Sequence, residues 1–328
     1  MGEGGVGGAG DDDAAAFARL VARYRPELHV HCYRLLGSFE ESGELVTETL
    51  SRAWRERETF AGHAAFRTWL YRIATHACLD HLAAAPRAPL PREVRGNGPV
   101  PATALPWLQP CPDTLLEQVC AQETGSDEVV AEETVSLAFV VALQLIPPRQ
   151  RAVFVLREVL GWPARETAAA LGVSVAAVNS ALQRARPAVR KRLPGTHEPT
   201  DPEDTAAPKT PGGPDTPAVP DTPAVPARGE DAVLRLYADA LAQGDAAALA
   251  TVLREGARTT RRPDPPDCRH LPTRMNRQPA VAHYARRPGE HVHRAHGLEV
   301  LRIEGGHITE ITVFAPGLFP AVGLPLAL

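Results

Sequence analysis

Apolar residues near the start of the chain recur at steps of three and four from Phe17 onward, the spacing of one helical face. This spacing predicts three successive helices, over 17–36, 45–54 and 66–77. No run among them alternates with the period of two that is typical of a strand. The pattern therefore predicts an all-helical domain over 14–85, behind a disordered, glycine-rich and acidic tail at 1–13.

Helical periodicity returns over 135–193. Within it, Gly172 predicts a tight turn, and Ser174 is a favoured residue type for capping the next helix. Val178 and Leu182 then fall on one inward face. Two helices joined by a short turn, with the longer one second, are typical of a DNA-binding helix-turn-helix.

The outward face of the second helix carries short, amide and arginine side chains. Asn and Gln pair with adenine, Arg pairs with guanine, and Ala contacts the thymine methyl group, all within the major groove. The residues predicted to face DNA are Ala176, Ala177, Asn179, Ser180, Gln183, Arg184 and Arg186. The alternative is an ordinary helical hairpin with a polar surface.

Charge favours the nucleic-acid interpretation. The formal net charge of −4 conceals a block over 143–193 with nine basic and two acidic residues. Acidic stretches flank it, with three basic and eight acidic residues over 86–142 and two basic and eight acidic over 194–231. A basic block of this kind suits phosphate backbones better than it suits a merely solvated helical face.

Two segments are predicted to be linkers. Residues 86–134 are rich in proline and then acidic, with a short apolar anchor around Trp107 that suits partner binding or packing. Residues 194–230 contain a tandem repeat, Asp215–Pro220 followed by Asp221–Pro226. Such Pro/Thr/Asp sequence buries too little apolar surface to fold, which predicts an extended, disordered spacer.

The remaining residues, 231–328, predict a small α+β domain. Two helices, over 232–242 and 246–253, are separated by a turn in which Asp245 is a candidate helix cap. After an irregular, basic middle, two strands are predicted over 296–303 and 307–314. They are joined by a glycine-containing hairpin turn.

Several classes of protein are disfavoured by composition. No apolar run approaches the ~18 residues of a membrane span, and the N-terminus lacks the pattern of a secretory signal. The five cysteines are scattered and include no Cys-x-x-Cys, so we expect a reducing cytoplasm, no disulfide framework and no zinc site. His29 and Cys32 share a helix face, but we interpret them as a surface histidine beside a buried cysteine. No cofactor is predicted.

A family resemblance joins these segments. Leu145–Arg186 resembles region 4 of sigma-70 family factors of the extracytoplasmic-function (ECF) type, and His31–Leu82 resembles region 2. Pro106–Leu116 and His293–Pro325 resemble the subgroup with a C-terminal SnoaL-like (NTF2-like) domain. The resemblance implies two all-α domains followed by an α+β domain, and an RNA polymerase sigma factor that directs promoter-specific initiation.

The resemblance also implies roles for residues. Region 4 would bind the polymerase β flap and read the −35 element through the residues above together with Ser174 and Arg190. Region 2 would bind the coiled coil of the β′ subunit through Glu41, Glu44, Leu45, Glu48 and Trp54. It would capture the −10 element through Phe60, His63, Phe66, Arg67, Trp69, Arg72 and His76. Their aromatic rings would stack bases and their arginines would contact phosphates.

Some of these roles have alternatives. Trp69 is as compatible with a place in the core as with base stacking. The acidic linker stands where region 3 is missing, and it would run through the polymerase cleft. Gly43 interrupts the acidic cluster of the core-binding helix, and His76 replaces a usual asparagine, which predict reduced core affinity and altered −10 recognition.

Two other classes of function fit the sequence less well. A helix-turn-helix regulator with a ligand-sensing SnoaL-like domain would have no use for the region 2 pattern. An enzyme would need a carboxylate or histidine in a pocket, for which Asp245, Asp264, Asp267, His283 and His291 are candidates by type alone. Arg258–Arg277 also lacks the aromatic residues that line such a cavity. We therefore predict a non-enzymatic C-terminal domain that modulates transcription, and a separate anti-sigma partner is left open.

Overall fold

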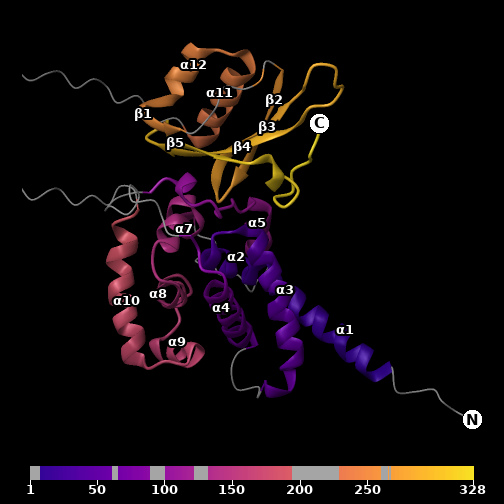
Figure 1. Cartoon of the computed structure of the whole chain (residues 1–328), viewed down its shortest axis with the longest axis vertical. Helices are drawn as coiled ribbons and strands as arrows, with labels where there is room; N and C mark the ends of the chain where they lie inside the picture. Colours follow the sequence, from indigo (N-terminus) through magenta and orange to yellow (C-terminus); the bar gives the residue numbers. More distant parts are fainter. Residues whose placement is uncertain are drawn as a thin grey trace, which may run out of the picture.

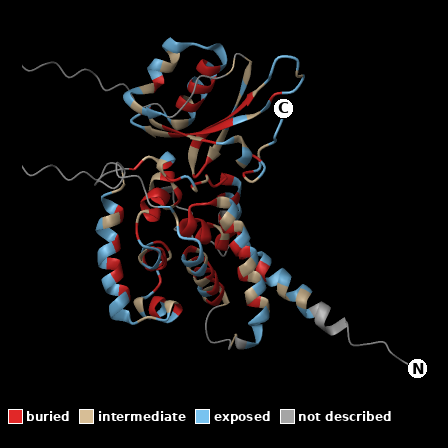
Figure 2. Ribbon diagram, viewed as in Figure 1, coloured by how far each residue is buried: buried red, intermediate tan, exposed pale blue. Residues whose placement is uncertain are grey.

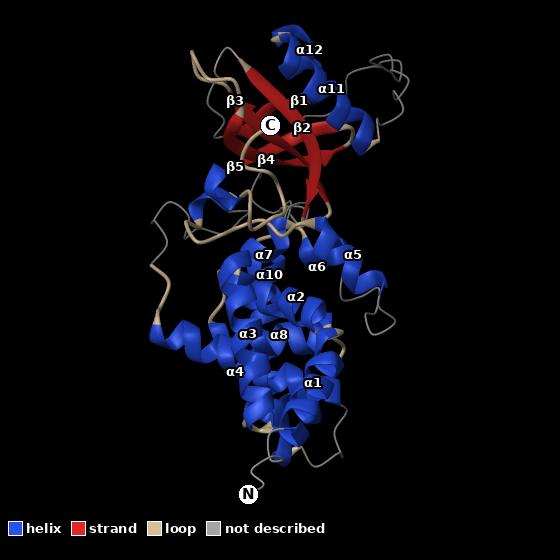
Figure 3. Ribbon diagram, turned by 90° about the vertical axis from the view of Figure 1, so that its right-hand side faces the viewer, coloured by secondary structure: helices blue, strands red, loops and turns tan. Residues whose placement is uncertain are grey.

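The computed structural model describes residues 8–60, 66–88, 100–121, 132–193, 229–259, 265 and 267–328. Helices α1 to α10 form one body, and a curved sheet with two further helices sits on one end of it (Figure 1). Turned by 90°, the same two parts are a helical half and a strand-containing half that meet through loops and short helices (Figure 3). This architecture confirms the predicted fold class. The predicted spacer at 194–230 lies, up to residue 228, outside the described residues.

The first helical unit contains α1 (Gly8–Ala22), α2 (Arg25–Leu36), α3 (Phe39–Arg55) and α4 (Phe66–Ala84). Two predictions are corrected here. The tail predicted to reach residue 13 already turns helical at Gly8, since the Ala-rich stretch behind the acidic residues favours a helix. The helix predicted over 17–36 is two helices, because Pro26 lacks an N–H and its ring excludes the preceding turn, so a new helix starts there.

The segment predicted as a linker over 86–134 contains short helices and buried residues in its described parts, 86–88, 100–121 and 132–134. It contains a 3₁₀ turn (Ala102–Ala104), α5 (Asp113–Ala121) and α6 (Glu132–Val135). Leu105, Leu108 and Leu116 are buried within it. Within the apolar anchor, Leu108 is buried and Trp107 is half-buried against the same core.

The second helical unit contains α7 (Leu137–Gln144), α8 (Pro148–Phe154), α9 (Ala164–Leu171) and α10 (Val175–Arg190). Helix α8 continues into a π-helical turn at Val155–Val159. Gly172 ends α9 with a φ of +63°, and the Ser174 hydroxyl accepts a 3.1 Å hydrogen bond from the Ala177 amide. The turn and the N-cap of the helix-turn-helix are both as predicted.

The C-terminal domain contains α11 (Glu230–Gln243), α12 (Ala246–Val252), β1 (Leu253–Thr259), β2 (Cys268–Met275), β3 (Gln278–Ala285), β4 (Arg294–Glu304) and β5 (His307–Phe314). The strand order is β1-β5-β4-β3-β2, and only the β1–β5 pair is parallel. A 3₁₀ turn (Pro316–Leu318) follows the sheet.

The sequence predicted the end of this domain better than its middle. Asp245 caps α12, and Gly305 and Gly306 form the β4–β5 turn with positive φ angles, as expected. The middle was expected to be irregular, but it supplies β1, β2 and β3. Strand β2 lies at a sheet edge and contains Pro272, while β3 is buried on both faces, so neither shows the apolar–polar alternation of a strand.

The central strands β3 and β4 are buried on both faces of the sheet, and this fixes the position of the domain (Figure 2). One face packs on α11, where Val281 and Leu301 meet Tyr237. The opposite face, with Tyr284 and Val300, shares a core with α2, the 100–121 segment and α7. The apolar contact between the two halves is therefore continuous with their own cores.

Candidate nucleic-acid and polymerase interfaces

Helix α10 presents the predicted −35 face to solvent. All nine residues expected to read this element are exposed: Ser174, Ala176, Ala177, Asn179, Ser180, Gln183, Arg184, Arg186 and Arg190. Val178, Leu182 and Ala185 are buried on the opposite side. Arg186 forms a 2.9 Å ion pair with Glu158 of the π-helical turn, in an exposed position where such a pair contributes little to stability. The arrangement suits insertion of the N-terminal half of α10 into a major groove.

The aromatic residues expected at the −10 element form one cluster. The Phe60 ring lies 5.4 Å from Phe66 and 5.3 Å from Trp69, measured between centroids. Trp69 is 4% exposed, whereas Phe60 and Phe66 are half-buried. The core alternative therefore describes Trp69 in this conformation, and the two phenylalanines keep faces that a base could reach.

The charged residues of the same group have different environments. Arg67 forms a 2.8 Å ion pair with Glu27, whose carboxylate is 1% exposed. Burial raises the pKa of Glu27, and the bond from Arg67 opposes that rise, so the pair is held inside the domain. Arg72 on the same helix is exposed, and His63 lies outside the described residues.

His76 is engaged by the other helical unit. Its Nε2 lies 2.8 Å from the Ala170 carbonyl oxygen in α9. Nearby, the Tyr71 and Trp162 rings approach to 6.1 Å between centroids. The residue predicted to alter −10 recognition is therefore covered by the helix-turn-helix.

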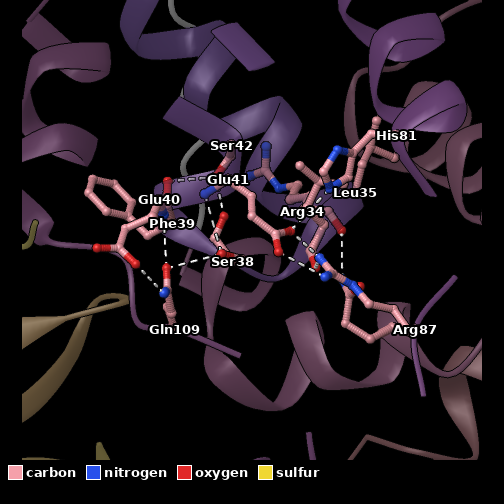
Figure 4. A network of polar contacts seen from close by, with 12 residues as sticks. Arg34, Leu35, Ser38, Phe39, Glu40, Glu41, Ser42, His81, Arg87 and Gln109 are labelled. Carbon is pink, nitrogen blue, oxygen red and sulfur yellow. Dashed lines mark hydrogen bonds and ion pairs between the residues drawn. The ribbon is translucent and has the colours of Figure 1, made fainter. Parts of the chain in front are cut away.

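The residues expected to bind core polymerase lie along α3, around the network in Figure 4. Glu41 accepts a 2.8 Å hydrogen bond from Arg87, which lowers the pKa of the carboxyl. Glu48 pairs with Arg52 one turn away, and Glu44 is exposed. Leu45 is buried and Trp54 is half-buried, so these two side chains pack α3 against the rest of the domain.

Gly43, which interrupts the acidic cluster, lies inside α3 without breaking it. A Cβ atom at this position would stand 3.4 Å from the His29 ring, which itself stacks on Phe39 at 4.4 Å. That separation is an ordinary van der Waals contact, so the ring would lie against a Cβ atom at this position without excluding it. His29 also lies 2.9 Å from the Phe39 carbonyl oxygen, so its ring serves packing.

Linker residues reach α3 on the same side. The Gln109 side chain accepts hydrogen bonds from the Ser38 hydroxyl (3.0 Å) and the Glu40 amide (2.8 Å), as Figure 4 shows. Arg87 also donates to the carbonyl oxygen of Leu36. Part of the acidic surface of α3 is thus already occupied by the chain's own linker.

Two further side chains tie the helical units together. Arg151 of α8 is 3% exposed and donates to the Leu35 carbonyl oxygen at the end of α2. Gln144 donates a 3.1 Å hydrogen bond to the Arg34 carbonyl oxygen. Burial lowers the pKa of Arg151 to about 9. Sequence analysis identified neither residue, because nothing in a local pattern marks a contact between separate modules.

The turn between β2 and β3 inserts into the helical body. Asn276 and Arg277 both have positive φ angles, +56° and +60°. The fully buried Asn276 side chain accepts from the Cys111 amide (2.8 Å) and donates to the Tyr33 hydroxyl (2.9 Å) and the Val135 carbonyl oxygen (2.6 Å). An Asn-initiated turn was detectable from the sequence, but its insertion was not.

Backbone and flanking contacts extend this insertion. The Asn276 amide donates to the Cys111 carbonyl oxygen at 2.8 Å, and the Arg277 amide donates to Asp113 at 2.8 Å. Gln278 accepts a 2.9 Å hydrogen bond from the Leu137 amide at the start of α7. We call Asn276, Arg277 and Gln278 the hairpin tip.

The described part of the chain contains neither a metal-binding cluster nor a membrane-spanning helix. No group of three or more His, Cys, Asp or Glu residues there is arranged to hold a metal ion. No helix there is long and apolar enough to cross a membrane. Cys32, Cys78 and Cys111 are buried free thiols.

Comparisons with known proteins match both helical units. The family model described as Sigma-70 region 2 matches residues 20–87, and the one described as Sigma-70, region 4 matches residues 136–188. The ECF RNA polymerase sigma factor SigG of Mycobacterium tuberculosis is 37% identical over 332 residues, covering 96% of this chain and 85% of that protein. The ECF factor SigW of Bacillus subtilis is 29% identical over 185 residues, covering 56% of this chain and 91% of its own.

One solved structure resembles the whole chain. The extracytoplasmic function sigma factor SigJ of Mycobacterium tuberculosis aligns over 94% of this chain and 99% of its own. The TM-score is 0.53 at 19% sequence identity. The likeness extends the shared fold to the C-terminal domain.

Proposed function

The chain belongs to the ECF sigma-70 family, and from this premise we propose that it reads promoters by opening a closed form that its C-terminal domain holds shut. As a sigma factor, it binds RNA polymerase and promoter DNA.

The main support is the contact between His76 and Ala170. The −35 and −10 elements lie about 25 base pairs apart, or about 85 Å along a B-form duplex. In the closed form, a −10 candidate is 2.8 Å from the helix-turn-helix that would read −35. One duplex cannot be read at both positions by modules in direct contact, so they must separate.

Roles for the two modules follow from exposure. We assign the −35 element to the exposed face of α10. We assign the −10 element to Phe60, Phe66 and Arg72, together with His76, which becomes accessible as the modules part. Region 2 would bind the β′ coiled coil through α3, and region 4 would bind the β flap. Transcription would place the protein in the cytoplasm, where it needs no catalytic residue or cofactor of its own.

The C-terminal domain would act as the clamp. Its hairpin tip joins α2, the 100–121 segment and α6–α7, which lie on both sides of the junction between the modules. Binding energy at the tip stabilises only the closed form, so it reduces the fraction of protein competent to read a promoter. The C-terminal domain would then inhibit the sigma factor from within the same chain, which is the role that a separate anti-sigma factor would otherwise have.

The sigma assignment is tested by binding to core polymerase. We expect the full chain to co-elute with core enzyme in gel filtration at micromolar concentration, and Glu44→Lys to weaken that complex by reversing an exposed charge of α3. Asp239→Lys on α11 is the matched control, since it reverses an exposed charge outside region 2. No complex with the unmodified chain would contradict the assignment.

A second prediction concerns α10. Arg184→Ala and Arg186→Ala are each expected to weaken binding to a −35 duplex by about 1–3 kcal/mol if the arginine reads a base. Arg235→Ala, an exposed arginine of α11, is the matched control. Fluorescence anisotropy on cognate and scrambled duplexes separates base reading from phosphate contact. Loss of a phosphate contact weakens binding to both duplexes alike. Unchanged affinity on every duplex would remove α10 from the interface.

A further inference from the structure

A polar chain crosses the apolar layer between α11 and the sheet. The Tyr237 hydroxyl donates a 2.8 Å hydrogen bond to Glu299, and the same carboxylate lies 3.1 Å from His283 Nε2. The other nitrogen of that ring, Nδ1, is 2.9 Å from His270 Nδ1. The apolar residues around the chain include Val281 and Leu301.

This chain leads from the core to the edge of the domain. His283 and Glu299 are each 2% exposed, whereas His270 is half-buried on the edge strand β2. Protons from solvent can therefore reach the buried pair through His270. The docking and DNA-reading surfaces described above do not involve these four residues.

Among the residues that the structure describes, few other ionisable groups face this layer. Arg274 lies further along β2 and pairs with Glu230 and Asp231 at the start of α11. Cys268 lies on the same face of β2, two residues before His270. The nearby part of β5 contributes the apolar Ile311 and Val313. Among the described residues, the histidines are the residues on this face whose type can change charge near neutral pH.

The contact between the two rings requires that one Nδ1 donate and the other accept. A neutral pair satisfies this. A pair with one added proton also satisfies it, because an imidazolium at His283 can donate from Nδ1 to His270. Its positive charge would then face the Glu299 carboxylate. With two added protons, both Nδ1 atoms carry hydrogens and two cations stand 2.9 Å apart. The contact then becomes repulsive.

From this geometry we propose that His270 and His283 form an acid-sensitive switch that releases the hairpin tip. Both histidines lie on the strands that the tip joins, where they face one another in the ladder six or seven residues from Asn276. The proposal rests on the clamp proposed above. Because the intact sheet resists the second proton, the closed form is favoured at neutral pH and loses stability as the pH falls.

The switch is tested by hydrogen exchange of the Asn276 and Arg277 amides in the full chain at pH 7.5 and pH 5.5, corrected for intrinsic exchange. We expect their protection to fall at least about tenfold on acidification, while buried amides of α10 stay protected. His270→Asn leaves one imidazole, so its tip should remain protected at pH 5.5. This site is half-buried, so the variant is expected to fold. His291→Asn, at an exposed histidine of the same domain, should behave like the unmodified chain.

The outcomes separate the switch from the clamp. Tip amides that exchange freely at pH 7.5 would contradict the clamp and the switch with it. Protection at pH 7.5 that persists in the unmodified chain at pH 5.5 would contradict the switch alone. So would an equal loss of protection in His270→Asn. A zinc-dependent gain of tip protection that needs both histidines would instead identify them as metal ligands and overturn the proton switch.

Discussion

Replacing Asn276 with glycine should undock the hairpin tip. Glycine accepts the +56° φ angle of this position, so the substitution removes the side chain without straining the backbone. Three hydrogen bonds are lost, and buried partners on Cys111, Tyr33 and Val135 are left without this partner. We expect a cost on the order of 3–5 kcal/mol to docking, or at least about a hundredfold shift toward the undocked form. Hydrogen exchange of the Cys111 amide measures it.

Arg277→Gly is the matched control. It changes the neighbouring residue of the same turn, which also has a positive φ, and it keeps the backbone bond to Asp113. We expect this substitution to weaken docking of the hairpin tip by less than about 1 kcal/mol, because it removes a half-buried charge near Asp113. Equal effects of the two variants would mean that the turn backbone, not the Asn276 side chain, holds the domain.

Trp69→Ala should destabilise the helical body by about 3–5 kcal/mol in the absence of DNA. The side chain is 4% exposed and packs against Phe60 and Phe66, so its removal leaves a cavity that the cluster cannot fill. Chemical denaturation followed by circular dichroism measures the change.

Arg72→Ala separates stability from DNA binding on the same helix. Arg72 is exposed, so its loss should alter unfolding by no more than about 0.5 kcal/mol while weakening binding to −10 single strands. If Trp69→Ala unfolds like the unmodified protein but binds −10 strands poorly, then Trp69 stacks on a base and is not a core residue.

Local sequence patterns predicted most of the fold. Helical periodicity located the segments of both helical units, and Ser174, Gly172 and Asp245 marked boundaries because capping and positive φ depend on a few adjacent residues. The same locality explains the errors. Strand β3 is covered on both faces and β2 is an edge strand, so the alternation that would have identified them is absent.

The candidate site was predictable only as separate surfaces. The exposed face of α10 follows from one helix and its period. The occlusion of His76 by Ala170 and the insertion of Asn276 beside Tyr33 join residues far apart in the chain. Arg67 shows the same limit: its type suited a phosphate, but burial of Glu27 nearby gives it an internal partner. No single-sequence pattern encodes these pairings.

The central claim is that this sigma factor must open against its hairpin clamp before it reads a promoter. The most direct measurement is run-off transcription with purified core polymerase on a cognate promoter fragment, titrating the unmodified chain and Asn276→Gly. We expect both proteins to produce a promoter-specific transcript that core enzyme alone does not. Asn276→Gly should reach half-maximal output at a concentration about tenfold lower, or lower still. A transcript that requires as much or more of the variant would contradict the clamp.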